Sequence, residues 1–151
     1  MMDEHLKEIA GILIAAVLVL DGLLHVYWAT GCIWPASDRL ALSQAVLNSN
    51  KTRLFKPATL VPLACMLFLG ALAVLVRLHL IEMPGAYLPS WLLELAVLAI
   101  TAGFLMLGLA GIIRALGLVK SKSRLYYRLN LIVYMPACLL LFAAAIAAFY
   151  S

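Results

Sequence analysis

Four long apolar stretches constrain the fold of this chain more than any other feature of its sequence. They extend over about residues 9–29, 58–76, 91–113 and 129–150, and each has about the 20 residues that a helix needs to cross a bilayer. Inside hydrocarbon, every backbone N–H and C=O group must find a partner within its own segment, so runs of this length must be helical. The sequence therefore predicts an all-α fold, a single domain (residues 1–151) built as a four-transmembrane-helix antiparallel bundle.

The composition places the chain in lipid rather than in water. Of its 151 residues, 66% are hydrophobic and only 12% are charged, whereas soluble domains are about half apolar and about a quarter charged. The formal net charge is +4. Because the Lys and Arg residues cluster at the ends of the apolar runs, we assign this charge to lipid headgroups and to membrane orientation. We therefore expect the lipid bilayer as a partner, and no nucleic acid.

The distribution of cationic residues predicts how the helices thread the membrane. Four Lys or Arg residues lie between residues 30 and 57, and five lie between residues 114 and 128. The others, Lys7 and Arg77, belong to the opposite side of a four-span topology. Short cationic loops stay in the cytoplasm, so both termini should lie outside (N-out/C-out). We expect a multi-pass protein of the bacterial cytoplasmic (inner) membrane.

The first connection is long enough to contain a short helix. Ser37 is suited to cap its N-terminus, and the helix should cover about residues 37–48. Leu40 and Leu47 would then share one face, which suits a helix lying along the cytoplasmic interface. A capped helix within the loop is the simpler interpretation, so its relation to the membrane stays open.

Packing between the helices should depend on small residues, because lipid removes the hydrophobic force that drives helices together in water. In the third run, Ala96, Ala99, Gly103 and Ala110 lie on roughly one stripe, and we expect this stripe to pack against a neighbouring helix. In the fourth run, Pro136 removes a backbone donor and should kink the helix. Bundle packing accounts for both features without a binding site.

Asp21 is the most informative single residue, because it lies well inside the first apolar run. An ionisable side chain there costs about 3 kcal/mol or more unless it is paired, protonated or hydrated. His25 and Trp28 follow at i+4 and i+7 and share its helical face. A carboxylate and an imidazole in this arrangement suit a proton relay, a cation site or a ligand site. Alternatively, they bond to each other or to a neighbouring helix and set the register of the bundle.

Depth in the membrane supplies candidate partners for this pair. Asn130 and Tyr134 begin the fourth run and should reach the depth of Asp21. Helical side chains lean towards the N-terminus of their helix, so Arg114, at the end of the third run, should lean into the membrane. We therefore predict that Arg114, rather than Arg128, is the charge partner of Asp21. The competing interpretation is that Arg114 only extends to lipid headgroups.

A second pair of ionisable residues is expected at the outer ends of the helices. Glu94 lies near the start of the third run, and Arg77 ends the second run on the same side. We expect an interfacial ion pair, and a proton-coupled transport site built on Glu94 is the alternative. No group of His, Cys and carboxylate residues reaches the usual number of metal ligands. No metal and no cofactor is therefore expected.

Two short motifs resemble those of a known family. The segment HVYWATGCIWP, residues 25–35, resembles the HxxWAxGxxWP region of domain of unknown function 3995, a bacterial family of small four-helix membrane proteins. The segment YMPACL, residues 134–139, is a partial match to that family's YSPLC motif. The resemblance implies the four-helix architecture and no established activity. It also places four residues at landmark positions on one membrane half: His25, Trp28, Trp34 and Pro136.

No catalytic fingerprint is present, and three classes of function remain open. The first is a protein that acts by binding, most concretely an immunity protein that protects against a membrane-acting toxin. The second is a small proton-coupled transporter that uses Asp21, His25 or Glu94. The third is an intramembrane enzyme, or a lipid or quinone binder, with a cytoplasmic-side pocket at Asp21 and His25. We place binding first because it requires least of the residues present. The partner would be a membrane-targeting protein, and the small residues would also permit homo-oligomers.

Overall fold

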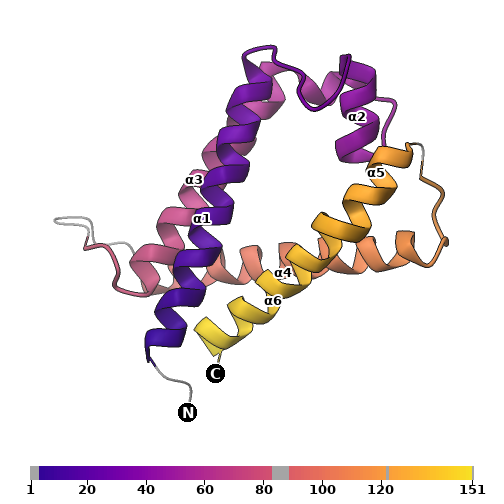
Figure 1. Ribbon diagram of the computed structural model, residues 1–151. Coiled ribbons are helices and arrows are strands. Elements are labelled where there is room, and N and C mark those ends of the chain that lie inside the picture. Colours follow the sequence, from indigo (N-terminus) through magenta and orange to yellow (C-terminus); the bar gives the residue numbers. More distant parts are fainter. Residues whose placement is uncertain (1–3, 83–88, 122, 151) are drawn as a thin grey trace.

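The four apolar runs form the four longest helices of the protein, shown in Figure 1. The structure, a computed structural model, describes residues 4–82, 89–121 and 123–150. In chain order the helices are α1 (Glu4–Ala29), α2 (Arg39–Leu47), the 3-10 helix η1 (Thr52–Phe55), α3 (Pro57–Arg77), α4 (Ser90–Ala115), α5 (Arg124–Leu129), the π-helical η2 (Asn130–Tyr134) and α6 (Met135–Tyr150). The last three are consecutive and form one long helix.

The predicted all-α fold with four membrane-spanning helices is confirmed. The four long helices have 26, 21, 26 and 27 residues, and each is apolar enough to cross a membrane. The chain therefore has the build of a multi-pass membrane protein. The last helix begins at Arg124, five residues before the predicted start at residue 129. It starts there because the side chain of Ser123 caps it by accepting a hydrogen bond from the backbone N–H of Tyr126.

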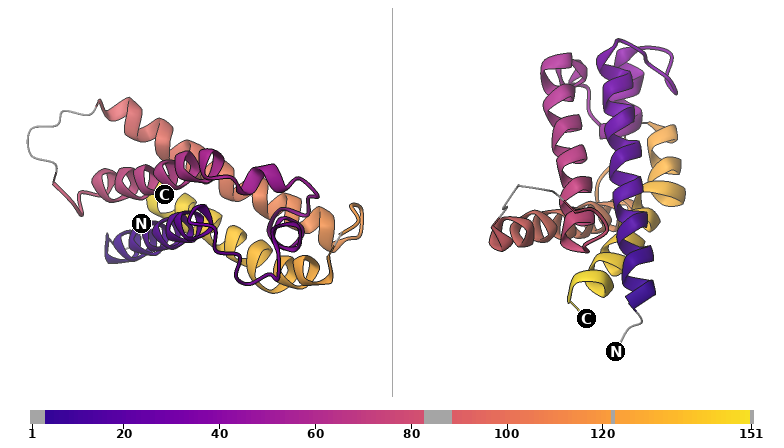
Figure 2. Two further views of the ribbon diagram at one scale, coloured as in Figure 1. Left: turned by 90° about the horizontal axis from the view of Figure 1, so that it is seen from above. Right: turned by 90° about the vertical axis from the view of Figure 1, so that its left-hand side faces the viewer.

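The long helices are arranged as two pairs that diverge. α1 lies alongside α3, and α4 lies alongside α6. In Figure 1 the pairs meet near the end of the molecule where both termini lie, and they separate towards α2. The right-hand view of Figure 2 shows α1 and α3 upright and side by side, with α4 lying across them, so the axes of the two pairs are far from parallel. Having both termini at one end is what four spans require, and the side of the membrane that this end faces stays a prediction.

Two apolar clusters hold the helices together. The larger joins all four long helices through Ile14, Ala15, Leu18, Ala71, Val74, Phe104, Leu141 and Ala145. The smaller lies at the α2 end and consists of Trp28, Leu42, Phe55 and Leu60. Asp21 and His25 lie on α1 between the residues that α1 contributes to the two clusters. The segment of α1 that carries Asp21 and His25 is thus packed in place on both sides, through Leu18 before it and Trp28 after it.

The packing face of α4 differs from the predicted stripe of small residues. Ala99 and Gly103 are exposed, whereas Gly108 and Gly111 are buried. A Cβ atom added at Gly111 would lie 2.8 Å from Met135 Cβ, which is closer than real contacts allow. The prediction was therefore wrong, because α4 approaches the last helix through its glycines and leaves the Ala99 side free.

The start of α2 also corrects a prediction. Asp38, rather than Ser37, is the N-cap, and its carboxylate accepts a hydrogen bond from the backbone N–H of Ala41 at 2.8 Å. Asp caps a helix as well as Ser does, and this one reaches the third amide of the helix. Leu40 and Leu47 are both exposed. This is the arrangement that the interfacial-helix interpretation requires.

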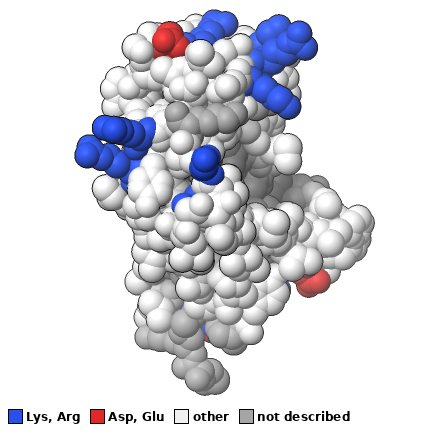
Figure 3. Space-filling view, turned by 90° about the vertical axis from the view of Figure 1, so that its right-hand side faces the viewer, with Lys and Arg blue, Asp and Glu red and all other residues white. Residues whose placement is uncertain are grey.

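The two basic connections lie at the same end of the molecule. Asn48, the C-cap of α2, donates a hydrogen bond from Nδ2 to the backbone carbonyl of Lys120 at 3.2 Å. On the face drawn in Figure 3, the visible Lys and Arg side chains gather on the upper half of the molecule, where α2 and α5 lie in Figure 1. A common cytoplasmic location requires both connections to lie at one end of the molecule, as they do here.

The π-helical segment η2 directly precedes Pro136. Proline has no N–H, and in an α-helix its ring clashes with the carbonyl four residues earlier. In η2 the backbone hydrogen bonds join residues five apart instead of four, and the N–H of Met135 donates to the carbonyl of Asn130. The widened turn relieves the disturbance that Pro136 was expected to cause, and it sets the direction of Tyr134.

Candidate functional site around Asp21 and His25

The carboxylate of Asp21 and the imidazole of His25 form a pair within one turn of α1. Nδ1 of His25 lies 3.4 Å from Oδ1 of Asp21 and 2.7 Å from the backbone carbonyl oxygen of Asp21. Because a carbonyl oxygen only accepts, Nδ1 must carry a proton, and this selects the tautomer. In the neutral imidazole, Nε2 is then an acceptor. Nε2 has no hydrogen bond to any residue within the described part of the chain.

The two side chains of the pair differ in exposure. The His25 side chain is only 13% exposed, whereas the Asp21 side chain is 48% exposed although it lies deep inside α1. The bundle thus supports the imidazole on most sides and leaves about half of the carboxylate uncovered. A ligand or water would meet the carboxylate first.

Trp28 anchors the next turn of the same face. Its ring centre lies 5.4 Å from that of His25 and 5.6 Å from that of Phe55, both in edge-to-face geometry. The indole Nε1 donates a hydrogen bond to the backbone carbonyl of Trp34 at 2.9 Å. The residue is only 7% exposed. His25 is therefore positioned by Asp21 on one side and by a fixed aromatic ring on the other.

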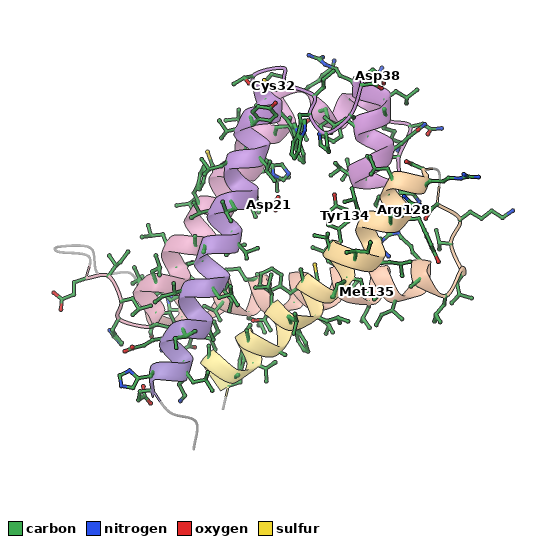
Figure 4. All side chains as sticks on the ribbon, viewed as in Figure 1. Asp21, Cys32, Asp38, Arg128, Tyr134 and Met135 are labelled. Atoms are coloured by element: carbon green, nitrogen blue, oxygen red, sulfur yellow. The ribbon has the colours of Figure 1, made fainter. Side chains whose placement is uncertain are left out.

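Tyr134 lies opposite this pair on η2. Figure 4 shows Asp21 and Tyr134 on facing sides of the space between α1 and the last helix. Asp21 is near enough to interact electrostatically with Tyr134 and with Cys138 of α6. No hydrogen bond joins Asp21 to either side chain within the described residues. Cys138 was not among the predicted site residues, although its spacing of i+4 from Tyr134 was the available signal.

Asn130 ties helices together instead of facing Asp21. Its side chain is buried, and Nδ2 donates a hydrogen bond to the backbone carbonyl of Gly111 at 3.0 Å. The missing side chain at Gly111 makes room for this approach, since a Cβ there would lie 3.2 Å from Asn130 Oδ1. Buried interhelical hydrogen bonds of this kind stabilise membrane bundles. This hydrogen bond therefore fixes the start of η2, the segment that also carries Tyr134.

The predicted ion pair between Asp21 and Arg114 is not formed. In the described residues Asp21 pairs with His25, and the Arg114 guanidinium lies 5.5 Å from the centre of the Tyr126 ring. Arg114 does lean into the protein, since its Nε is buried without a hydrogen-bond partner in the part that the structure describes. The helix pairs diverge, so the end of α4 lies near α5 rather than beside the middle of α1. Tyr126 supplies a cation–π contact there instead, and sequence reasoning missed its role.

Arg77 and Glu94 both lie at the opposite end of the bundle, but they do not form the expected ion pair. Both line one surface pocket of about 550 Å³, together with Trp91 and Tyr150. No ion pair joins Arg77 to Glu94 in the described structure. Both residues therefore line one pocket without forming an ion pair with each other.

These features define a class of protein: a four-span helical membrane protein whose first span presents a carboxylate–imidazole pair towards the last. The chain belongs to the family described as protein of unknown function (DUF3995), which matches residues 9–145. This confirms the family that the two motifs indicated. No curated protein and no solved structure matches the chain.

Proposed function

We propose that this protein acts in the bacterial cytoplasmic membrane by binding rather than by catalysis, and that Asp21 and His25 receive the polar group of its ligand. The observation that carries the proposal is the half-exposed carboxylate of Asp21 in the middle of a span. A charge at such depth costs about 3 kcal/mol or more when it faces hydrocarbon. His25 offsets part of that cost. The uncovered half of the carboxylate requires water or a polar ligand group.

The chemistry of the site suits a ligand that donates hydrogen bonds. Asp21 offers carboxylate oxygens, and Nε2 of neutral His25 offers a lone pair. Tyr134 adds a hydroxyl on the facing wall. The exposed residues of α1 beside the pair include Leu20 and Leu24, so the rest of the ligand should be apolar. An amphiphile with a hydroxyl or ammonium head fits these requirements.

The test compares co-purified amphiphiles in wild-type protein and in Asp21→Asn. The protein is extracted from bacterial membranes in mild detergent, and bound molecules are identified and quantified by native mass spectrometry. We expect a bound amphiphile in the wild type and about tenfold less in Asp21→Asn, because a hydrogen bond to a charged group contributes about 1.5–3 kcal/mol.

Asp38→Asn is the matched control. It removes the same charge from an exposed residue, and Asn preserves the helix cap. Its ligand content should equal that of the wild type. Equal ligand content in wild type and Asp21→Asn, with both folded by circular dichroism, would refute the proposal.

Protection against a membrane-acting toxin is a second way in which this protein would act by binding, and it uses a different surface. The exposed face of α4 supports it, because a Cβ at Gly103 would meet nothing within 4 Å and a partner helix has room to approach. Cells that co-express a neighbouring toxin gene should keep growing when this protein is present, and Gly103→Leu should remove the protection. Ala16→Leu, on the exposed side of α1, is the control. Absence of growth rescue by the wild type would exclude this form.

A further inference from the structure

The pocket at the end of the bundle where both termini lie combines two opposite charges with an apolar floor. It has a volume of about 550 Å³ and lies between α3, α4 and α6. Arg77 contributes a guanidinium from the last turn of α3, and Glu94 contributes a carboxylate from the start of α4. Trp91 and Tyr150 are largely exposed beside them. Aromatic residues of this kind sit at the level of lipid headgroups.

The two charges are available to a ligand. Neither Arg77 nor Glu94 forms an ion pair with any residue that the structure describes. The neighbouring segment 83–88 lies outside the described residues, and its sequence contains no charged side chain. A molecule that carries one negative and one positive group would therefore satisfy both side chains together.

We infer that this pocket binds the headgroup of a zwitterionic phospholipid with a primary ammonium group, of the phosphatidylethanolamine type. The Arg77 guanidinium donates hydrogen bonds to the phosphate, because its planar set of N–H donors matches the spacing of phosphate oxygens. The Glu94 carboxylate accepts hydrogen bonds from the ammonium. A choline headgroup has no N–H to donate, and a glycerol headgroup has no cation, so both should bind less tightly.

Apolar side chains continue the site from the headgroup into the membrane. Leu95 and Leu98 line the pocket, and each is exposed on α4. They follow Glu94 along the direction in which α4 enters the bilayer. An acyl chain that lies along them keeps the lipid in the orientation that its headgroup contacts require.

The experiment measures lipid selectivity. Purified protein in detergent is mixed separately with detergent micelles that contain dioleoyl phosphatidylethanolamine, phosphatidylcholine or phosphatidylglycerol at equal concentrations, and bound lipid is quantified by native mass spectrometry. We expect the wild type to prefer phosphatidylethanolamine roughly fivefold, the ratio that about 1 kcal/mol supplies at an exposed ion pair. Glu94→Gln should abolish the preference over phosphatidylcholine. Arg77→Gln should weaken binding of all three lipids.

Glu82→Gln is the matched control, since Glu82 is an exposed carboxylate near the same end that does not line the pocket. It should keep the wild-type selectivity. Equal binding of the three lipids by the wild type would overturn the inference. So would a preference for phosphatidylglycerol that Glu94→Gln leaves unchanged, since the site would then recognise anionic lipid only. Both outcomes are independent of the Asp21 site.

Discussion

Trp28→Ala should lower the free energy of unfolding by about 3–5 kcal/mol, the range for truncating a buried aromatic side chain. Trp28 is the contribution of α1 to the smaller apolar cluster, where it packs with Leu42 of α2, Phe55 and Leu60. Its loss leaves a cavity between α1 and α2 and frees the ring of His25 on one side. The measurement is unfolding by SDS in mixed micelles, followed by circular dichroism.

Trp34→Ala is the control for this experiment. The residue is 67% exposed, and only its backbone carbonyl receives the hydrogen bond from Trp28. The bond survives the substitution, so the change in stability should stay below about 1 kcal/mol. If Trp34→Ala proved as damaging as Trp28→Ala, the cluster assigned to Trp28 would not be what holds α2 to α1.

Gly111→Ala should destabilise the protein by about 1–3 kcal/mol, although Ala is the better helix former. The added Cβ would lie 2.8 Å from Met135 Cβ and 3.2 Å from Asn130 Oδ1. Met135 Cβ is attached to the backbone and cannot turn aside, so α4 and the last helix must separate. The separation also lengthens the hydrogen bond from Asn130 to the Gly111 carbonyl. The same SDS titration measures the effect.

Gly103→Ala is an internal control on the same helix. A Cβ at Gly103 meets nothing within 4 Å, so only helix propensity acts, and the variant should be slightly more stable by up to about 1 kcal/mol. A Gly111→Ala protein as stable as Gly103→Ala would contradict the close approach of α4 to the last helix.

Sequence reasoning located much of the candidate site but not its contacts. Asp21, His25 and Trp28 share a face because i, i+4 and i+7 coincide on any α-helix, and the structure brings all three together. Tyr134 faces them across the bundle. Depth along a helix is also a local property, yet equal depth did not bring Arg114 to Asp21, since depth says nothing about the distance between two helices.

Some residues could not be assigned from the sequence at all. Tyr126 meets Arg114 because α5 continues into the last helix through the π-helical turn. A change of this kind rotates the residues on its two sides relative to each other. The face that each residue presents therefore depends on how Pro136 is accommodated.

The four spans, their limits to within five residues and the family followed from the sequence alone, because apolar length and short motifs are local properties of the chain. Tertiary structure decided which faces of the helices are buried and which charges meet. Those outcomes depend on the angles between helices, and the angles depend on where two backbones can approach. In this protein the approach occurs at Gly108 and Gly111 rather than along the Ala99 stripe, since only a residue without a side chain leaves room for the last helix there.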